Sequence, residues 1–285
     1  MPELAGEEMT TGHLILGLWS GILILTGLAA WLHALVHRKW VVTTKGPPPQ
    51  WRPSVVDFAL LGIVVFVAVG LVGPLVAMEI MNLLPEDENG ANDWAFLVQS
   101  LSMQGAILGL LLLFFLVQRQ TFKTTGGGPS GGLRHSLKWG LYGFVLALPL
   151  VSVSSFVTMF LFRQLGWDFQ LQETVEEIAN VESTLLFLLM PLPVVILAPL
   201  WEEIVFRAGL FRYLKNLVPV LAAGLLSAAC FSLIHMQPAQ FGGLFVMGCM
   251  LALVYQKSGS LWAPICLHAI FNANTMLAIF FMRFG

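Results

Sequence analysis

The sequence is short of charged residues, and this lack excludes most soluble folds. Only 11% of its 285 residues are charged, 57% are hydrophobic, and the mean hydropathy is +0.82. Soluble domains carry about 25% charged residues, so this chain has too few to cover a surface in water. A net charge of −2 also argues against a general nucleic-acid binder, which would present a basic face. We therefore expect no nucleic-acid partner.

Several common sequence signatures are also missing. The cysteines Cys230, Cys249 and Cys266 lie in apolar runs without a CxxC spacing, which argues against a disulfide framework or a zinc ribbon. There is no HExxH motif, so a zincin-type site is absent. The acidic segment 1–12 lacks the basic region of a cleavable signal peptide, so we expect the first helix to be retained. No internal repeat is visible, which weakens a transporter interpretation.

What the sequence does contain is a series of long apolar runs. A membrane-spanning helix needs roughly 20 mainly apolar residues, and we count about eight candidate spans on this criterion. The predicted fold is therefore an all-α, polytopic bundle in a lipid bilayer. The candidate segments are 12–36, 54–80, 94–117, 137–162, 184–200, 201–236 (two passes or a kinked pair), 240–256 and 261–282.

The segment 185–220 is interrupted by prolines at 191, 193, 199 and 219. We expect a helix over about 183–198, a proline break, and a second helix over about 200–217. The two helices form either one kinked pass or include a re-entrant half-helix. Such breaks are tolerated at membrane depth only where the freed backbone lines a cavity or packs on protein.

The charged residues of the loops alternate in sign and predict an orientation. Basic residues follow the first and third spans, the segment near 212, and the seventh span, whereas the loops near 86 and 173 are acidic. By the positive-inside rule the basic loops are cytoplasmic and both termini lie outside. We expect the inner membrane of a prokaryote, a flexible linker over 126–132, and a short amphipathic helix over 166–182 on the outer surface.

Ionisable residues inside a bilayer are costly and indicate function by default. Asp57 and Glu79 flank the second span, where we interpret them as interfacial or structural. Glu202, Glu203 and Arg207 are different, because all three lie within one apolar helical segment. Glu203 and Arg207 are four residues apart with the acid first, the favourable order for an ion pair within a helix. Adjacent helical residues point about 100° apart, so Glu202 faces a different environment.

Two further polar groups follow in the next helices. His235 stands one turn after Phe231, and His268 and Asn272 stand four apart on one face of the last helix. Each feature alone is also typical of structural hydrogen bonding between membrane helices. Together with Glu202, these side chains supply what peptide hydrolysis needs, namely a base for water and donors for an oxyanion.

The ordered set EExxxR, FxxxH and HxxxN resembles the CAAX protease and bacteriocin-processing family of intramembrane endopeptidases, which contains the type II CAAX prenyl proteases. The resemblance covers about 183–282 as a catalytic membrane domain, and 1–180 is a transmembrane region without an assigned role. One departure is Ala208, where the family usually has glycine. The matching residues are Glu202, Glu203, Arg207, Phe231, His235, His268 and Asn272.

The resemblance implies a role for each of these residues. Glu202 would be the general base that activates water, with His235 assisting it. His268 and Asn272 would stabilise the oxyanion, while Glu203 and Arg207 would hold the helix and Phe231 would support His235. The expected substrates are membrane peptides or proteins, with prenylated C-termini and leader peptides both open.

Three alternatives are left open by the residues. A metal such as zinc could bind Glu202, His235 and His268, although the mechanism implied by the resemblance needs no cofactor. The chain could be a non-catalytic scaffold or regulator of the same fold. It could also be a proton-coupled transporter that uses Glu202 and His235 as a relay. The intact motif set favours the protease.

Overall fold

The computed structural model describes residues 11–36, 51–84, 93–121, 132–167, 178, 181 and 183–284. Within these ranges the chain is helical and contains no strand, which confirms the all-α prediction. The elements are α1 (Thr11–Val36), α2 (Val55–Val67), η1 (Ala68–Val72), α3 (Gly73–Leu83), α4 (Asp93–Val117), α5 (Gly132–Gln164), α7 (Thr184–Leu189), η3 (Leu192–Leu197), α8 (Ala198–Glu203), η4 (Ile204–Phe211), α9 (Arg212–Lys215), α10 (Val220–Leu233), η5 (Pro238–Gln240), α11 (Phe241–Ser258) and α12 (Trp262–Phe284).

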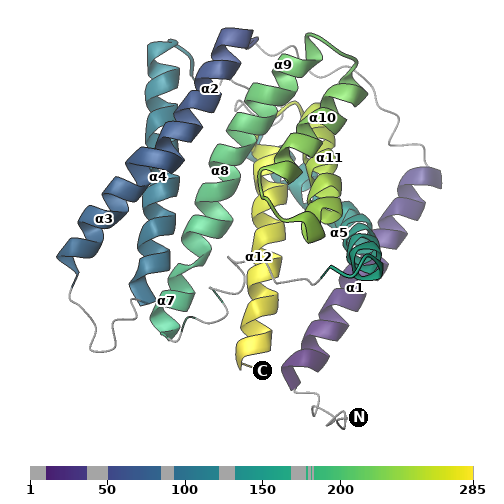
Figure 1. Cartoon of the computed structure of the whole chain (residues 1–285). Helices are drawn as coiled ribbons and strands as arrows, with labels where there is room; N and C mark the ends of the chain where they lie inside the picture. The colour runs from purple at the N-terminus through teal and green to yellow at the C-terminus, as the bar shows by residue number, and fades with distance from the viewer. Residues whose placement is uncertain are drawn as a thin grey trace.

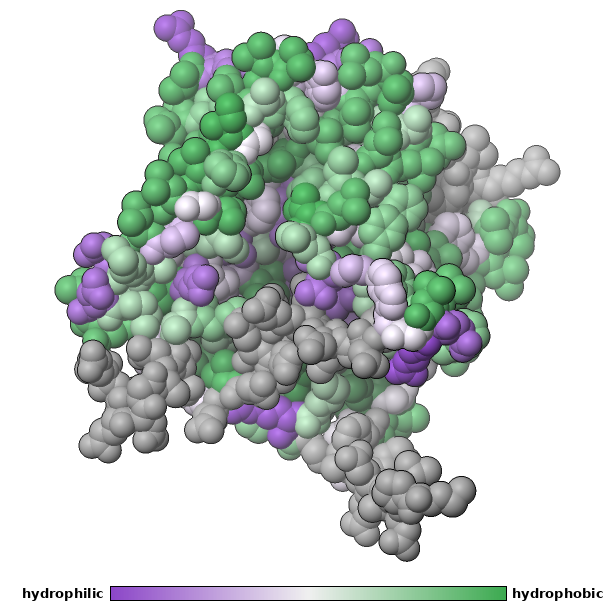
Figure 2. Space-filling view, viewed as in Figure 1, coloured by the Kyte–Doolittle hydropathy of each residue, from purple (hydrophilic) through white to green (hydrophobic). Residues whose placement is uncertain are grey.

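Seven helical runs of the described chain are long and apolar enough to cross a membrane. They match the predicted spans except in the segment 184–236, where one run ends at Lys215 and is followed by α10, a shorter apolar helix of 14 residues. The protein is therefore an integral, multi-pass membrane protein of seven long helices and a shorter eighth. Much of the face in Figure 2 is hydrophobic, as the lipid-facing side of a bundle must be. The long runs are Leu14–Val36, Val55–Leu83, Trp94–Val117, Leu133–Gln164, Thr184–Lys215, Pro238–Ser258 and Trp262–Phe284.

The run Thr184–Lys215 is one continuous pass, although a proline break was expected within it. Two π-helical segments, η3 and η4, flank the six residues of α8, and Figure 1 shows α7, α8 and α9 as a single rod. Pro191 and Pro193 lie at the beginning of η3, where the wider turns accommodate the missing backbone donors. π-helical turns inside α-helices are rare and occur frequently at functional sites.

Close helix contacts fix the position of α11 and α12 within the bundle. Helix α5 packs against α1, α11 and α12, and α10 packs against α11. A Cβ added at Gly140 would lie 2.6 Å from Cys266 Cβ on α12, and one at Gly248 would lie 2.9 Å from Ala228 Cα on α10. These glycines allow the backbones to approach closely, as small residues do in membrane bundles. Helices α8, α10, α11 and α12 thereby surround one buried region.

The first and last described helices bring both termini to one end of the bundle. Helix α1 begins and α12 ends at the same end, whereas α4 ends, α2 begins and α9 lies at the opposite end (Figure 1). Asp57 closes a capping box with Ser54 at the beginning of α2, which confirms its structural role. The expected linker, apart from Gly132 itself, and the larger part of the expected 166–182 helix lie outside the described residues.

Candidate active site

The two glutamates lie on α8 and are both withdrawn from the surface. Glu203 is 0% exposed and Glu202 is 8% exposed. A neighbouring helix helps to hold the backbone that follows the glutamates. The Ser227 hydroxyl on α10 donates a hydrogen bond to the Phe206 carbonyl of η4 over 3.1 Å. Two carboxylates in a row at this depth need partners, since buried charges without partners are strongly destabilising.

Glu203 and Arg207 form the predicted ion pair within the helix. Arg207 Nε lies 3.1 Å from Glu203 Oε2, and both side chains are fully buried. The guanidinium is held further by its Nη2, which donates to the Gly248 carbonyl over 3.2 Å. It also lies 4.7 Å from the centre of the Phe231 ring, in a cation–π contact. Phe231 thus supports Arg207, a role that the sequence did not reveal.

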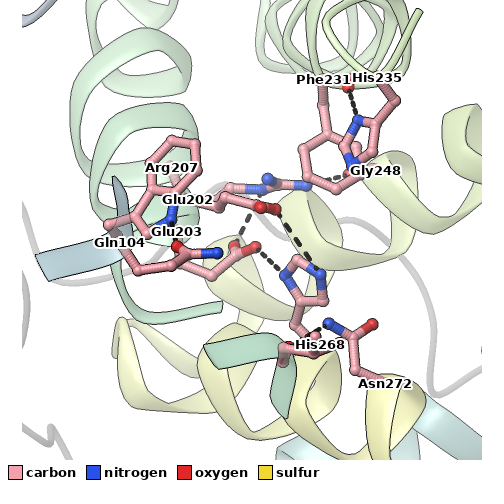
Figure 3. Close-up of polar contacts among 11 residues, drawn as sticks. Gln104, Glu202, Glu203, Arg207, Phe231, His235, Gly248, His268 and Asn272 are labelled. Carbon is pink, nitrogen blue, oxygen red and sulfur yellow. Dashed lines mark hydrogen bonds and ion pairs between the residues drawn. The ribbon is translucent and has the colours of Figure 1, made fainter. Parts of the chain in front are cut away.

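His268 stands between the two glutamates and contacts both (Figure 3). Its Nδ1 lies 3.0 Å from Glu203 Oε1, within hydrogen-bond distance. Its Nε2 lies 3.7 Å from Glu202 Oε2, so that pair is in ion-pair range but is not a short hydrogen bond. Because a carboxylate only accepts, the contact with Glu203 favours a proton on Nδ1 and fixes the ring orientation. Helices α8 and α12 are therefore joined by a chain of four side chains, Arg207, Glu203, His268 and Glu202.

His235 belongs to the same region, but within the described part of the chain it forms no hydrogen bond or ion pair with the glutamates. Its Nδ1 donates to the Phe231 carbonyl over 2.7 Å, because a carbonyl can only accept. This bond leaves Nε2 unprotonated in the neutral ring and able to accept a hydrogen bond. The ring centroids of His235 and Phe231 are 4.8 Å apart, and Figure 3 shows the two side chains next to each other.

Asn272 is one turn beyond His268, as the HxxxN spacing requires, but its amide is partly engaged elsewhere. Its Nδ2 donates to the Val194 carbonyl of η3 over 2.8 Å. The bond uses one of the two amide hydrogens and satisfies a backbone carbonyl in the π-helical segment. Asn272 thus also ties α12 to η3, and one hydrogen of its amide is left for a further acceptor.

Comparisons with known proteins agree with this geometry. Residues 183–274 match the family described as type II CAAX prenyl endopeptidase, Rce1-like. A Bacillus subtilis (strain 168) protein named "Putative membrane peptidase YdiL" is 24% identical over 196 residues, which cover 68% of this chain and 75% of the relative. By both matches the chain is similar to proteins of the CAAX protease and bacteriocin-processing family. No solved structure matches it significantly.

Within this family of membrane proteases, the match to the family model includes α8, η4, α10, α11 and the part of α12 that carries His268 and Asn272. The site described above therefore lies wholly inside the matched region. Ala208, the departure from the usual family glycine, is fully buried. Its single methyl group is accommodated in the apolar core formed with α2 and α4.

One residue outside the matched region also reaches the site. Gln104 of α4 is buried, and its Oε1 accepts a hydrogen bond from Nε1 of Trp201, the residue before Glu202. Figure 3 places Gln104 next to the two glutamates. The sequence could have indicated Gln104, because a polar side chain within an apolar span is costly unless it has a partner. Residues 1–180 thus contribute at least one contact that anchors the glutamate helix.

The zinc alternative has no preassembled ligand set in the described part of the chain. Glu202 and His268 lie close together, but no group of three or more His, Cys, Asp or Glu side chains is arranged there to hold a metal ion. His235 would have to turn its Nε2 toward the other two side chains to complete such a set.

Proposed function

We propose that this protein is an intramembrane endopeptidase that hydrolyses peptide bonds with a water molecule activated by Glu202. The observation that carries the proposal is the environment of the Glu202 carboxylate. It is 8% exposed, and its Oε2 accepts no hydrogen bond from the described part of the chain. A buried carboxylate oxygen without a donor is costly unless it binds water or substrate. Glu203 Oε2 likewise accepts no hydrogen bond of good geometry in the described part of the chain. Glu203 differs because it is ion-paired with Arg207 at 3.1 Å and its Oε1 lies 3.0 Å from His268 Nδ1.

The summed charge of Glu202, Glu203, Arg207 and His268 is compatible with a general base that binds and releases one proton. Two glutamates carry two negative charges, and Arg207 supplies one positive charge. One further proton, shared between Glu202 and His268, makes the buried group neutral, and a neutral group avoids the penalty of an unpaired buried charge. The 3.7 Å contact between Glu202 Oε2 and His268 Nε2 is where that proton can be exchanged through a water molecule.

The catalytic step follows from these positions. With the shared proton on His268 Nε2, Glu202 is a carboxylate and removes a proton from water, and the oxygen attacks the carbonyl carbon of the scissile peptide bond. Glu202 is then neutral, so His268 Nε2–H is free to donate to the oxyanion that forms. The second amide hydrogen of Asn272 is the other donor. When the intermediate collapses, the C–N bond breaks and Glu202 returns its proton to the leaving amine.

We assign His235 the role of orienting the attacking water molecule. Its Nδ1–H is fixed on the Phe231 carbonyl, so the neutral ring presents an acceptor at Nε2. That acceptor takes a hydrogen bond from the attacking water and orients it toward the carbonyl carbon, while Glu202 takes the proton. No metal ion or cofactor is needed by this scheme.

The depth of the site fits a membrane-associated substrate. From Glu202 to the end of its pass at Lys215 the chain rises about 20 Å at 1.5 Å per residue. Figure 2 shows a hollow near the centre of one face, between the regions over α8 and over α10 and α11, with polar atoms inside it. A peptide in the bilayer could enter there. The substrates we propose are membrane peptides or proteins, including lipidated ones, because the matching family is described as a CAAX prenyl endopeptidase.

The test is a comparison of cleaved ends in cells. Cells that express the wild-type chain and cells that express Glu202→Gln are compared by mass spectrometry of new N- and C-termini in their membrane proteins. We expect a set of termini that depends on the wild-type chain and survives chelation of metals in isolated membranes. A scaffold would give the same termini with both chains, and that result would overturn the proposal.

A further inference from the structure

A basic pocket lies at the end of the bundle where α2 begins and α9 ends. Its volume is about 230 Å³, and its lining residues are Trp51, Arg52, Arg212, Lys215 and Asn216. A single water needs only about 10–15 Å³ of such volume, so the pocket can hold a larger group. Lys215 is the last residue of one membrane pass and Val55 is the first of another, which sets the pocket at the membrane surface.

The charge that defines this pocket is Arg212, a buried cation without an anion. Its side chain is only 6% exposed. Its Nη1 donates one long hydrogen bond of 3.4 Å to the Trp51 carbonyl, and its guanidinium lies 5.5 Å from the centre of the Tyr255 ring. No carboxylate of the described chain forms an ion pair with it. A buried charge of this kind is costly unless a counter-charge is supplied.

The chain has almost no acidic side chain at this end of the bundle that could neutralise Arg212. The sequence contains no Asp or Glu in 204–285 or in 37–56. Asp57 is the acidic residue at the beginning of α2, and it is already occupied. Its Oδ2 accepts from the Ser54 backbone and hydroxyl over 2.7 and 2.8 Å, and its Oδ1 accepts from Gln118 over 3.0 Å. The counter-charge for Arg212 must therefore come from outside the described chain.

The two other cations are arranged to bind the same group. Lys215 Nζ donates one hydrogen bond of 2.6 Å to Gln256 Oε1, which holds the ammonium in place and leaves two N–H groups. Arg52 is exposed at the edge of the pocket. A planar guanidinium and an ammonium that converge on one cavity are the donors with which proteins bind phosphate oxygens.

We propose that this pocket binds the phosphate of an anionic phospholipid. The surroundings favour a lipid over free phosphate, because the exposed apolar side chains Val55 (61%) and Leu217 (62%) flank the cationic residues and offer a surface for acyl chains. Basic pockets between transmembrane helices bind anionic headgroups in this way. The site is separate from the glutamate cluster, although α9 continues directly from the helix that carries Glu202.

The test uses the full chain purified in a neutral maltoside detergent. Its melting temperature is measured with phosphatidylglycerol, with phosphatidylcholine, and with inorganic phosphate at the same phosphorus concentration. A ligand that binds only the folded state raises the melting temperature. The test variant is Arg52→Gln with Lys215→Gln. Its matched control is Arg134→Gln with Lys138→Gln, which removes two exposed cations of α5 outside the pocket.

We expect phosphatidylglycerol to stabilise the wild-type chain and the control, and phosphatidylcholine to have little effect. Each basic residue near an anionic headgroup contributes roughly fivefold to affinity, so the test variant should bind about 30-fold more weakly. If the double variant does not fold, the single variant Arg52→Gln replaces it. This variant changes an exposed side chain and should weaken binding about fivefold.

Equal binding by test and control variants would overturn the site. Equal stabilisation by inorganic phosphate would overturn the lipid as its ligand. Because the experiment measures lipid binding, its result does not depend on whether the protein is a peptidase.

Discussion

Replacing Glu203 by glutamine should destabilise the protein far more than the same change at Glu202. Glu203 is fully buried and lies 3.1 Å from Arg207 Nε and 3.0 Å from His268 Nδ1. The amide keeps the size of the side chain but removes its charge, so the guanidinium of Arg207 is left buried without a counter-ion. Among the described residues, the polar contact of Glu202 is the 3.7 Å approach to His268, and its carboxylate is not needed to neutralise Arg207.

The expected difference can be estimated. Breaking a buried ion pair by removing one partner costs about 3–5 kcal/mol, a large share of a typical folding margin of about 5–15 kcal/mol. At roughly 2–4 °C for each kcal/mol, Glu203→Gln should lower the melting temperature by roughly 6–20 °C. Glu202→Gln should remain near the wild-type melting temperature, because it breaks no close pair. This variant should instead cleave peptide about 10²–10⁴-fold more slowly, which is the usual effect of losing a positioned general base.

The assay pairs two measurements on each purified variant. The melting temperature is recorded in detergent, and cleavage is followed with a peptide that the wild-type protein hydrolyses. The control is the double variant Glu203→Gln with Arg207→Met, which removes both members of the pair. Replacing a whole buried pair by apolar side chains of similar size is often neutral. The double variant should therefore recover much of the stability that Glu203→Gln loses, while activity stays low because His268 has lost its anionic partner.

Two results would refute this reasoning. Normal cleavage by Glu202→Gln would mean that another group activates the water. A Glu202→Gln variant that unfolds, beside a stable and inactive Glu203→Gln variant, would mean that the two roles are reversed.

Three further predictions follow from the fold and the site. His268→Gln should reduce cleavage by about 10²-fold or more yet lower the melting temperature less than Glu203→Gln does, because the buried carboxylate–guanidinium pair remains; an equal loss of stability would make the histidine chiefly structural. Gly248→Ala should destabilise the bundle, since its Cβ would lie 2.9 Å from atoms of α10, whereas Gly105→Ala, with nothing within 4 Å, should be neutral or better by thermal melting. Reporter fusions at Gly127 and Gly285 should report opposite sides of the membrane, and the same side for both would contradict the topology.

The parts of the site that follow from helical periodicity could be predicted from the sequence. The pairing of Glu203 with Arg207 is fixed by a spacing of four residues, and the structure places the two atoms 3.1 Å apart. The spans were predictable for a similar reason, because the bilayer demands long apolar helices. In both cases the information is local, and neighbouring residues in the chain determine it.

The contacts between helices could not be predicted in this way. The sequence did not predict that His268 Nδ1 would lie against Glu203 Oε1, a pairing of residues 65 positions apart. Asn272 donates to Val194 on the π-helical segment η3, a stretch that was expected to be part of an ordinary helix over about 183–198. The widening of a helix into π turns depends on the packing of its neighbours, and no single spacing in the sequence specifies it. Gln104 was missed although its position in an apolar span marked it as unusual.

The two buried arginines of the glutamate helix illustrate how one chain handles buried charge in two ways. Arg207 and Arg212 are five positions apart and are 0% and 6% exposed. Arg207 receives a carboxylate from its own helix, a carbonyl from α11 and an aromatic ring from α10. Arg212 receives one long bond and the ring of Tyr255, and faces a cavity. Since the same desolvation penalty applies to both, the first cation is balanced within the protein, at the site where water would be activated. The second depends on an anion from the membrane surface.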